Sequence, residues 1–267
     1  TSSAAQQLTD ANMKALATFL VLLNYFTRCH GWICTIAPEH LAATQIDAGN
    51  GMVVMTDKNS NAFFLSDSSW SKLGSVTLKH VSVGHAGVWG VDRDNTVYKF
   101  AAGDFFPTRG LSLIQVDAGE GQVVGVTSQN SIHCLNGSSA SSIEEEGVLK
   151  WNTITGALMY ISCGPLGCWG VNSAQNIYFG KVSPDTCGIS SWSQVDGAAV
   201  KVEVGSDGRV FVVNQSGNVF ERAGISKALP QGTAWSHISF CVIIKHVTYD
   251  LGRLWLLTDA GVILNCI

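Results

Sequence analysis

Short runs of apolar and β-branched residues recur along the chain, and turn residues separate them. Residues 87–98 show the pattern clearly: Gly-Val-Trp-Gly-Val is followed by the polar group Asp-Arg-Asp-Asn and then by Thr-Val-Tyr. Runs of this length, bounded by glycine, asparagine and aspartate, are typical of β-strands joined by tight turns. The pattern therefore predicts a β-hairpin, and no run of helical period follows residue 31.

The same hairpin recurs six times, with spacings of 35 to 45 residues. One polar position marks the copies: Asp57, Asp92, Thr127, Asn172, Asn214 and Thr258. Five residues after each comes an apolar position: Ala62, Val97, Ile132, Ile177, Val219 and Ile263. A constant offset within copies of varying spacing indicates a fixed hairpin with variable outer loops.

An aromatic residue opens the last strand of most copies: Trp70, Phe105, Trp151, Trp192 and Trp235. The sixth copy lacks such a strand, but residues 32–36, which begin at Trp32, have the same pattern. The sequence therefore predicts an all-β, six-bladed β-propeller of four-stranded repeats, closed when the N-terminal strand completes the last blade. Cys34 and Cys266 would then lie on neighbouring strands, where a disulfide can form.

The N-terminal residues are interpreted as export sequence. Met13 and Lys14 precede an apolar run at residues 15–26, which is typical of a signal peptide and too short for a membrane span. We expect residues 1–12 to be upstream and disordered, residues 13–31 to be the signal peptide, and residues 32–267 to be the propeller. The protein is then secreted and extracellular, and its seven remaining cysteines indicate disulfides with one cysteine left over.

Charge and motifs argue against two classes of function. The net charge is −4 and lysine and arginine form no run, so no phosphate-binding stripe is expected and nucleic acid is excluded as a partner. The histidines are scattered singly, and Cys163 and Cys168 are separated by four residues, which fits neither a redox nor a zinc motif. We predict no enzyme; the alternative is a glycosidase with two opposed carboxylates in the propeller funnel.

Four stretches of the chain resemble a known family. Residues 87–91 and residues 163–172 (Cys-Gly-Pro-Leu-Gly-Cys-Trp-Gly-Val-Asn) are similar to the tectonin repeat, and residues 45–49 and 245–256 resemble the fish egg lectins within that family. The likeness runs from about residue 34 to residue 267. It implies a secreted, non-catalytic, six-bladed tectonin propeller in egg or body fluid that binds N-acetylglucosamine-type sugars on microbial or egg glycans in innate defence, and that can carry calcium and self-associate.

The resemblance also implies three disulfides: Cys34–Cys266, Cys134–Cys187 and Cys163–Cys168. The sequence departs from the family at Thr258, where the family supplies a partner for Cys241. We therefore expect Cys241 to be free, buried or available for an intermolecular bond.

Sugar recognition needs an aromatic face and fixed polar groups. The predicted contacts are three tryptophans and six residues of the hairpin turns: Trp89, Trp169, Trp255, Asp92, Asn95, Asn172, Asn176, Asn214 and Asn218. The structural alternatives are that the tryptophans form the core between blades and that the Asx residues cap their own turns. Repeated turns would present several weak sites, and hence a multivalent lectin. The alternative function is a protein-binding scaffold without sugar specificity.

Metal and modification sites complete the expectations. No EF-hand spacing occurs, so no cofactor is required, and calcium is considered only at Asp207 and Asp250. The acidic run at residues 144–146 is interpreted as a solvated loop. Sequons occur at Asn136 and Asn214, and Asn136 is the predicted glycosylation site.

Overall fold

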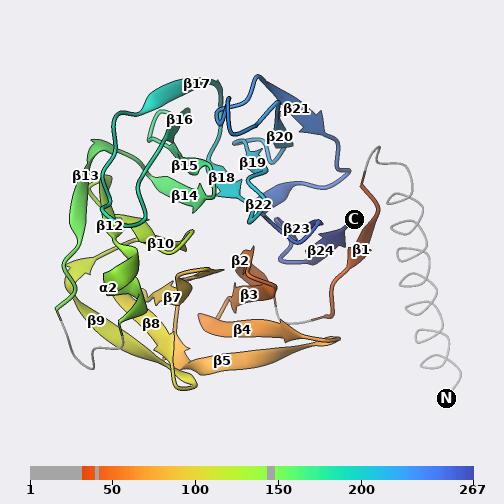
Figure 1. Cartoon of the computed structure of the whole chain (residues 1–267). Helices are drawn as coiled ribbons and strands as arrows, with labels where there is room; N and C mark the ends of the chain where they lie inside the picture. Colours follow the sequence, from red (N-terminus) through yellow and green to blue (C-terminus); the bar gives the residue numbers. More distant parts are fainter. Residues whose placement is uncertain (1–31, 40–41, 143–147) are drawn as a thin grey trace, which may run out of the picture.

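The described part of the chain forms a ring of six β-sheets. The structure, a computed structural model, describes residues 32–39, 42–142 and 148–267. Its strands form six four-stranded antiparallel sheets arranged as blades around a central axis (Figure 1). The predicted six-bladed propeller is confirmed.

The strands follow one another in chain order from the axis to the rim. Blade 1 has β2 (Ala43–Gly49), β3 (Met52–Asp57), β4 (Asn61–Ser66) and β5 (Ser69–Thr77). Blade 2 has β6 (His80–Gly84), β7 (Gly87–Val91), β8 (Thr96–Ala101) and β9 (Asp104–Ser112). Blade 3 has β10 (Gln115–Ala118), β11 (Val123–Val126), β12 (Ser131–Leu135) and β13 (Asn152–Ala157). Blade 4 has β14 (Tyr160–Gly164), β15 (Gly167–Val171), β16 (Asn176–Gly180) and β17 (Ser193–Ala198). Blade 5 has β18 (Lys201–Val204), β19 (Val210–Val213), β20 (Val219–Ala223) and β21 (Ala234–Ile238). Blade 6 has β22 (Ile244–Asp250), β23 (Arg253–Thr258), β24 (Ile263–Cys266) and, outermost, β1 (Cys34–Ile36).

The two ends of the described chain meet in blade 6. Strand β1 pairs antiparallel with β24, and Cys34 lies opposite Cys266 (Figure 1). The two cysteines form a disulfide. The prediction that the N-terminal strand closes the ring is confirmed, and a covalent bond supplements its three residue pairs.

The hairpin repeat takes the predicted form between the second and third strands of each blade. The apolar residue five positions after the polar one is buried in all six copies, because it faces the core between blades. The polar residue stands at the start of the turn. In blade 2, for example, Asp92 Oδ1 accepts the backbone N–H groups of Asp94 and Thr96 at 2.9 and 2.8 Å. Both columns of the repeat are therefore structural.

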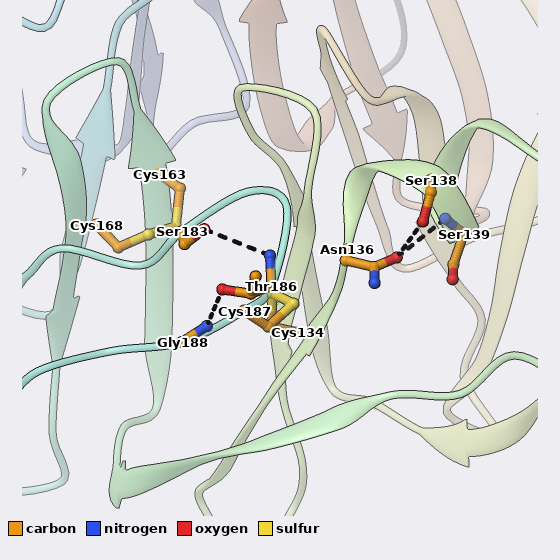
Figure 2. Close-up of a disulfide and its surroundings, with 10 residues drawn as sticks. All are labelled: Cys134, Asn136, Ser138, Ser139, Cys163, Cys168, Ser183, Thr186, Cys187 and Gly188. Carbon is orange, nitrogen blue, oxygen red and sulfur yellow. Dashed lines mark hydrogen bonds between the residues drawn. A yellow bond between two sulfur atoms is a disulfide. The ribbon is translucent and has the colours of Figure 1, made fainter.

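The other two implied disulfides are also present (Figure 2). Cys163–Cys168 joins β14 to β15 within one hairpin, and Cys134–Cys187 ties β12 of blade 3 to the loop after β16 of blade 4. Cys241 lies on the surface, outside these three disulfides.

One short helix departs from the all-strand expectation. Helix α2 (Gly137–Ser141) is a single turn, and Asn136 caps it by accepting the N–H of Ser139 at 3.0 Å (Figure 2). Five residues are too few to show helical periodicity, so the sequence pattern does not predict this helix. None of the described helices is long and apolar enough to cross a membrane. The sequon at Asn136 thus lies at a helix cap, and glycosylation there stays a prediction.

Several expectations fall outside the described residues. These are the upstream segment at residues 1–12, the signal peptide at residues 13–31 with cleavage after residue 31, and the acidic run at residues 144–146. They stay predictions.

Candidate functional site

The polar turn residues expected to contact sugar are already engaged with their own backbone. Asn172 Oδ1 accepts the N–H groups of Ala174 and Asn176 at 3.0 and 2.9 Å. Asn214 Oδ1 accepts those of Ser216 and Asn218 at 3.0 and 2.9 Å. A side-chain oxygen used in this way holds the turn closed and is not free to bind a hydroxyl group. The Oδ1 atoms of Asn172 and Asn214 therefore cap their own turns, as the structural alternative expects.

The polar turn residues of blade 2 are engaged in the same way. The second carboxylate oxygen of Asp92 accepts the hydroxyl of Tyr98 at 3.0 Å. Asn95 has a left-handed backbone, with φ of 69°, and its Oδ1 accepts a hydrogen bond from Lys79 Nζ. A sugar contact from either residue would have to compete with these partners.

The three predicted tryptophans are core residues. Trp89, Trp169 and Trp255 are 0%, 1% and 4% exposed, and each packs among the apolar side chains of neighbouring blades. Trp89 Nε1 donates to the carbonyl of Ala86 at 2.8 Å. No ring face is open to a ligand, so the prediction that these tryptophans stack on sugar is wrong. They lie on the second strand of their blades, which other strands cover.

The half-buried aromatic residues lie instead at the rim, where each last strand begins. Trp235 Nε1 donates to the carbonyl of Asp196 in blade 4 at 2.7 Å, and Trp192 Nε1 donates to that of Thr155 in blade 3 at 2.8 Å. Each indole therefore leans on the rim strand of the preceding blade. The sequence had identified these residues only as strand markers.

A glycine permits this approach of Trp235. Gly197 has φ of 104°, and a Cβ there would lie 3.1 Å from Trp235 Nε1. Trp169 supports the indole from the core, edge-on at 5.9 Å between ring centroids, and the guanidinium carbon of Arg222 lies 5.0 Å from the Trp235 ring. The position of Trp235 is therefore fixed from several sides.

A hollow of about 260 Å³ opens beside Trp235, between blades 4 and 5, and is called here the rim hollow. Its lining is Ile177, Gly197, Ala198, Val212, Asn214, Phe220 and Trp235. Asn214 is thus the one predicted site residue that the structure brings to this hollow. Its Oδ1 holds the turn, whereas its Nδ2 makes no hydrogen bond to any described residue. The rim hollow therefore combines two aromatic side chains with an amide donor.

A larger hollow of about 460 Å³ lies between blades 6 and 1. It includes Trp70, Pro38, Met55 and Val262, and its one charged lining residue is Glu39. Its walls are mainly apolar, and Glu39 and the indole of Trp70 are its polar side chains.

Comparison with known proteins places the chain in a family. The family model of the tectonin domain matches residues 42–259. The chain belongs to the tectonin family. The fish-egg lectin of Cyprinus carpio is 42% identical over 238 residues, which cover 88% of this chain and 98% of that protein.

Solved structures share the fold of this tectonin chain at low sequence identity. A protein of unknown function from Bacteroides thetaiotaomicron has a TM-score of 0.57 at 13% identity, with 88% of this chain and 76% of that chain covered. The Pan2 WD40 domain of Neurospora crassa has a TM-score of 0.55 at 11% identity, with 88% and 94% covered. At such identities the likeness shows the propeller fold alone.

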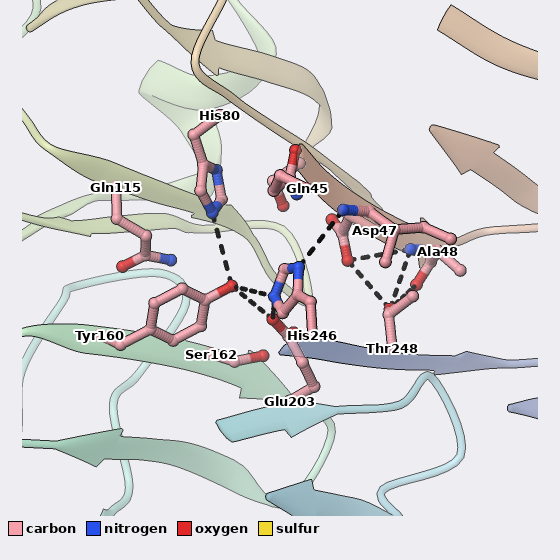
Figure 3. A network of polar contacts seen from close by, with 12 residues as sticks. Gln45, Asp47, Ala48, His80, Gln115, Tyr160, Ser162, Glu203, His246 and Thr248 are labelled. Atoms are coloured by element: carbon pink, nitrogen blue, oxygen red, sulfur yellow. Dashed lines mark hydrogen bonds and ion pairs between the residues drawn. The ribbon is translucent and has the colours of Figure 1, made fainter. Parts of the chain in front are cut away.

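The tectonin propeller also has polar side chains around its axis, on the innermost strand of each blade. One ring of them alternates between carboxylates and hydroxyls: Asp47, Ser82, Asp117, Ser162, Glu203 and Thr248. Five of the six accept a backbone N–H group of the next blade, and Figure 3 shows the contact of Thr248 with Ala48. Asp47 accepts the N–H of Val83 at 2.8 Å, and Thr248 accepts that of Ala48 at 2.9 Å, so blades 1, 2 and 6 are linked side chain to backbone.

Glu203 is the exception in this ring. Its carboxylate accepts the hydroxyl of Tyr160 at 2.5 Å and lies 3.0 Å from His246 Nε2 (Figure 3). Tyr160 also lies 3.4 Å from His80 Nε2, so four titratable groups meet on the axis. Burial raises the pKa of Glu203 to about 7 and lowers the pKa of both histidines well below the usual range.

Raised carboxyl pKa values are typical of an active site, but the space beside the acids on the axis is too small for a sugar ring. Burial, followed by the charge of Glu203, raises the pKa of Asp47 to about 7 and that of Asp117 well above its usual value. The space beside these three acids is about 30 Å³. That volume holds a water molecule or two and no sugar ring.

The two residues considered for calcium accept hydrogen bonds from protein groups. Asp250 accepts the N–H of Gly51 at 2.7 Å and the hydroxyl of Ser206, and Asp207 accepts the N–H of Arg209 at 2.9 Å. No group of three or more metal-binding side chains occurs in the part of the chain that the structure describes. Each carboxylate serves at least one protein donor, and calcium at Asp207 and Asp250 stays a prediction.

Proposed function

We propose that this tectonin chain is a secreted, carbohydrate-binding lectin that takes a sugar with an N-acetyl group in the rim hollow. The observation that carries the proposal is the pairing of Trp235 and Phe220 with the unused amide donor of Asn214. A pyranose ring has one face of C–H groups that packs on an aromatic side chain, while its hydroxyl and carbonyl oxygens accept hydrogen bonds. The name of the carp relative, a fish-egg lectin, supports sugar binding.

The proposed sugar is of the N-acetylglucosamine type. An acetamido group has a methyl that packs on an apolar wall and a carbonyl that accepts from an amide, and Phe220 and Asn214 supply both to one hollow. Trp70 and Trp192 recur at matching rim positions, each with its Nε1 donating to a carbonyl of the preceding blade. Related weak sites around the rim would give the multivalency that recognition of microbial or egg glycans in innate defence requires.

Secretion and the absence of catalysis belong to the same proposal. The three disulfides fit an oxidising compartment, because such bonds do not persist in reducing cytosol. The channel acids have too little space for a glycoside, which argues against the glycosidase alternative. Calcium has no part in the proposal.

The test is binding of N-acetylglucosamine oligomers by calorimetry to the full, disulfide-bonded chain. We expect Trp235→Ala to weaken binding by about tenfold or more, because it removes the stacking surface. Phe106→Ala is the control: it removes an exposed aromatic side chain from the outer strand of blade 2, away from the rim hollow and from the rim tryptophans, and should bind as the wild type does.

A second variant separates folding from recognition. Asn214→Asp keeps the oxygen that caps the turn and replaces the free donor by an acceptor, so the variant should fold and lose affinity. Equal affinity in Trp235→Ala, Asn214→Asp and the wild type would rule out the rim hollow as the sugar site. Capture of protein partners that free sugar does not compete would favour the scaffold alternative.

A further inference from the structure

A third hollow lies on the propeller axis, at the end of the central channel where the innermost strands begin. It has a volume of about 260 Å³ and is called here the basic mouth. Its lining is Thr44, Gln45, Lys79, His80, Ile114, Lys201, Lys245 and His246. Three lysines and two histidines are present and no carboxylate, although the chain as a whole carries a net negative charge. Such a segregation of charge indicates a site for a negative ligand.

Lys201 is the most unusual of these residues. Its side chain is half-buried and lines the basic mouth, its ammonium lies 4.1 Å from the centre of the Tyr160 ring, and it makes no hydrogen bond to any described residue. An ammonium group has three donors, and Lys201 uses none of them on the described part of the protein, so all three are available to a ligand in the basic mouth. The ring offers a cation–π contact but cannot accept three hydrogen bonds.

The neighbours of Lys201 leave these donors unused. Glu203, the nearby carboxylate, is bonded to Tyr160 and His246. Burial lowers the pKa of Lys201 to about 8, and the positive charge of Lys245 acts in the same direction. Positive charge from three lysines thus converges on the basic mouth, and no carboxylate lines it.

We propose that the basic mouth binds a small oxyanion, with phosphate as its simplest form, and that Lys201 is its central contact. An oxyanion supplies several acceptors in a compact volume, which suits the unfilled donors of Lys201 and the charge of Lys245. Lys79 adds a further positive charge to the basic mouth, and its ammonium donates a hydrogen bond to Asn95. This site is separate from the rim hollow and does not depend on the proposed sugar function.

The experiment titrates inorganic phosphate into the full, disulfide-bonded chain at constant ionic strength, with sodium chloride as the reference salt. Calorimetry and the shift in thermal midpoint report binding. We expect Lys201→Met to weaken phosphate binding by about tenfold or more, because it removes a charged hydrogen-bonding partner of similar shape. Lys227→Met, at an exposed lysine outside the basic mouth, should bind phosphate as the wild type does.

Two further arms identify the source of the oxyanion and guard against misfolding. Glucose 6-phosphate binding more tightly than phosphate would indicate a sugar phosphate, equal affinity would indicate the oxyanion alone, and glucose should not bind. Lys201→Met should keep the circular dichroism spectrum of the wild type and a cooperative thermal transition without phosphate, so that a loss of phosphate binding is not a loss of folding. Phosphate binding that is absent, or that is the same in Lys201→Met and the wild type, would overturn the proposal.

Discussion

Replacing Glu203 by glutamine removes one acid from the axis of the propeller and keeps the shape of its side chain. Burial raises the pKa of Glu203 from its usual 4.5 to about 7. Between these two pH values the folded chain holds a proton that the unfolded chain has released, so rising pH favours unfolding. At about 1.4 kcal/mol per pH unit, the cost above pH 7 is on the order of 3 kcal/mol, and it vanishes below pH 4.5.

We therefore expect Glu203→Gln to gain stability over the wild type as the pH rises from about 4.5 to 7, and to keep that gain above pH 7. The charge of Glu203 also contributes to the raised pKa of Asp47, so the variant relieves that second acid in the same direction. The buried histidines act oppositely, because the unfolded chain takes up protons below about pH 6.5 that the folded chain refuses. In the wild type the two effects partly cancel, so the difference between variant and wild type isolates the acid.

The measurement is urea unfolding followed by tryptophan fluorescence from pH 5 to 8.5, with the disulfides intact. Glu39→Gln, which changes an exposed acid at the rim, serves as the control and should track the wild type at every pH. A Glu203→Gln variant that is less stable than the wild type at pH 8, or whose advantage does not grow with pH, would refute the account of the channel.

Two further predictions concern closure of the ring and the rim hollow. Cys34→Ser/Cys266→Ser removes a cross-link over a sequence separation of 232 residues and should cost up to about 5 kcal/mol of unfolding free energy, against about 2 kcal/mol for Cys163→Ser/Cys168→Ser, whose separation is 5 residues; equal urea midpoints for the two variants would contradict this. Gly197→Ala places a Cβ 3.1 Å from Trp235 Nε1 at a positive φ, so it should destabilise the chain by about 1–3 kcal/mol and weaken sugar binding. Gly103→Ala, also at a positive φ but with nothing within 4 Å, should show the backbone cost without loss of binding.

The fold was readable from the sequence because each hairpin repeats its own local rule. A polar residue that caps a turn and an apolar residue five positions later, as in Asn172 and Ile177, need only their own blade to take effect. Closure was readable for a related reason: the sixth repeat lacked a strand, and residues 32–36 had the pattern of one.

The candidate site was harder to read because exposure depends on the neighbouring blade. Trp169 and Trp235 both lie on short strands, but other strands cover Trp169, while Trp235 rests on the rim strand of blade 4. A signal did exist: polar Ser236 and His237 follow Trp235, whereas Gly170 and Val171 follow Trp169. Residue chemistry alone favoured three tryptophans that are buried in the core.

The channel was missed for a different reason. In β2, Gln45 and Asp47 alternate with Ile46, a pattern that normally places polar residues in solvent. In the structure both side chains are buried, and they accept hydrogen bonds from the backbone of the next blade in place of water. One chain segment cannot reveal that a polar face points at an axis shared by six sheets.

The alternation of acids and hydroxyls around the axis limits how single blades can be added or lost. Carboxylates occupy the ring in blades 1, 3 and 5, as Asp47, Asp117 and Glu203, and hydroxyls occupy it in blades 2, 4 and 6. Inserting or deleting one blade would place two acids, or two hydroxyls, on adjacent strands. Glu203 already raises the pKa of both other acids from one blade further away. Duplicating a pair of blades keeps acids and hydroxyls alternating, whereas a single added blade keeps the acids apart only if it carries an uncharged residue at this position.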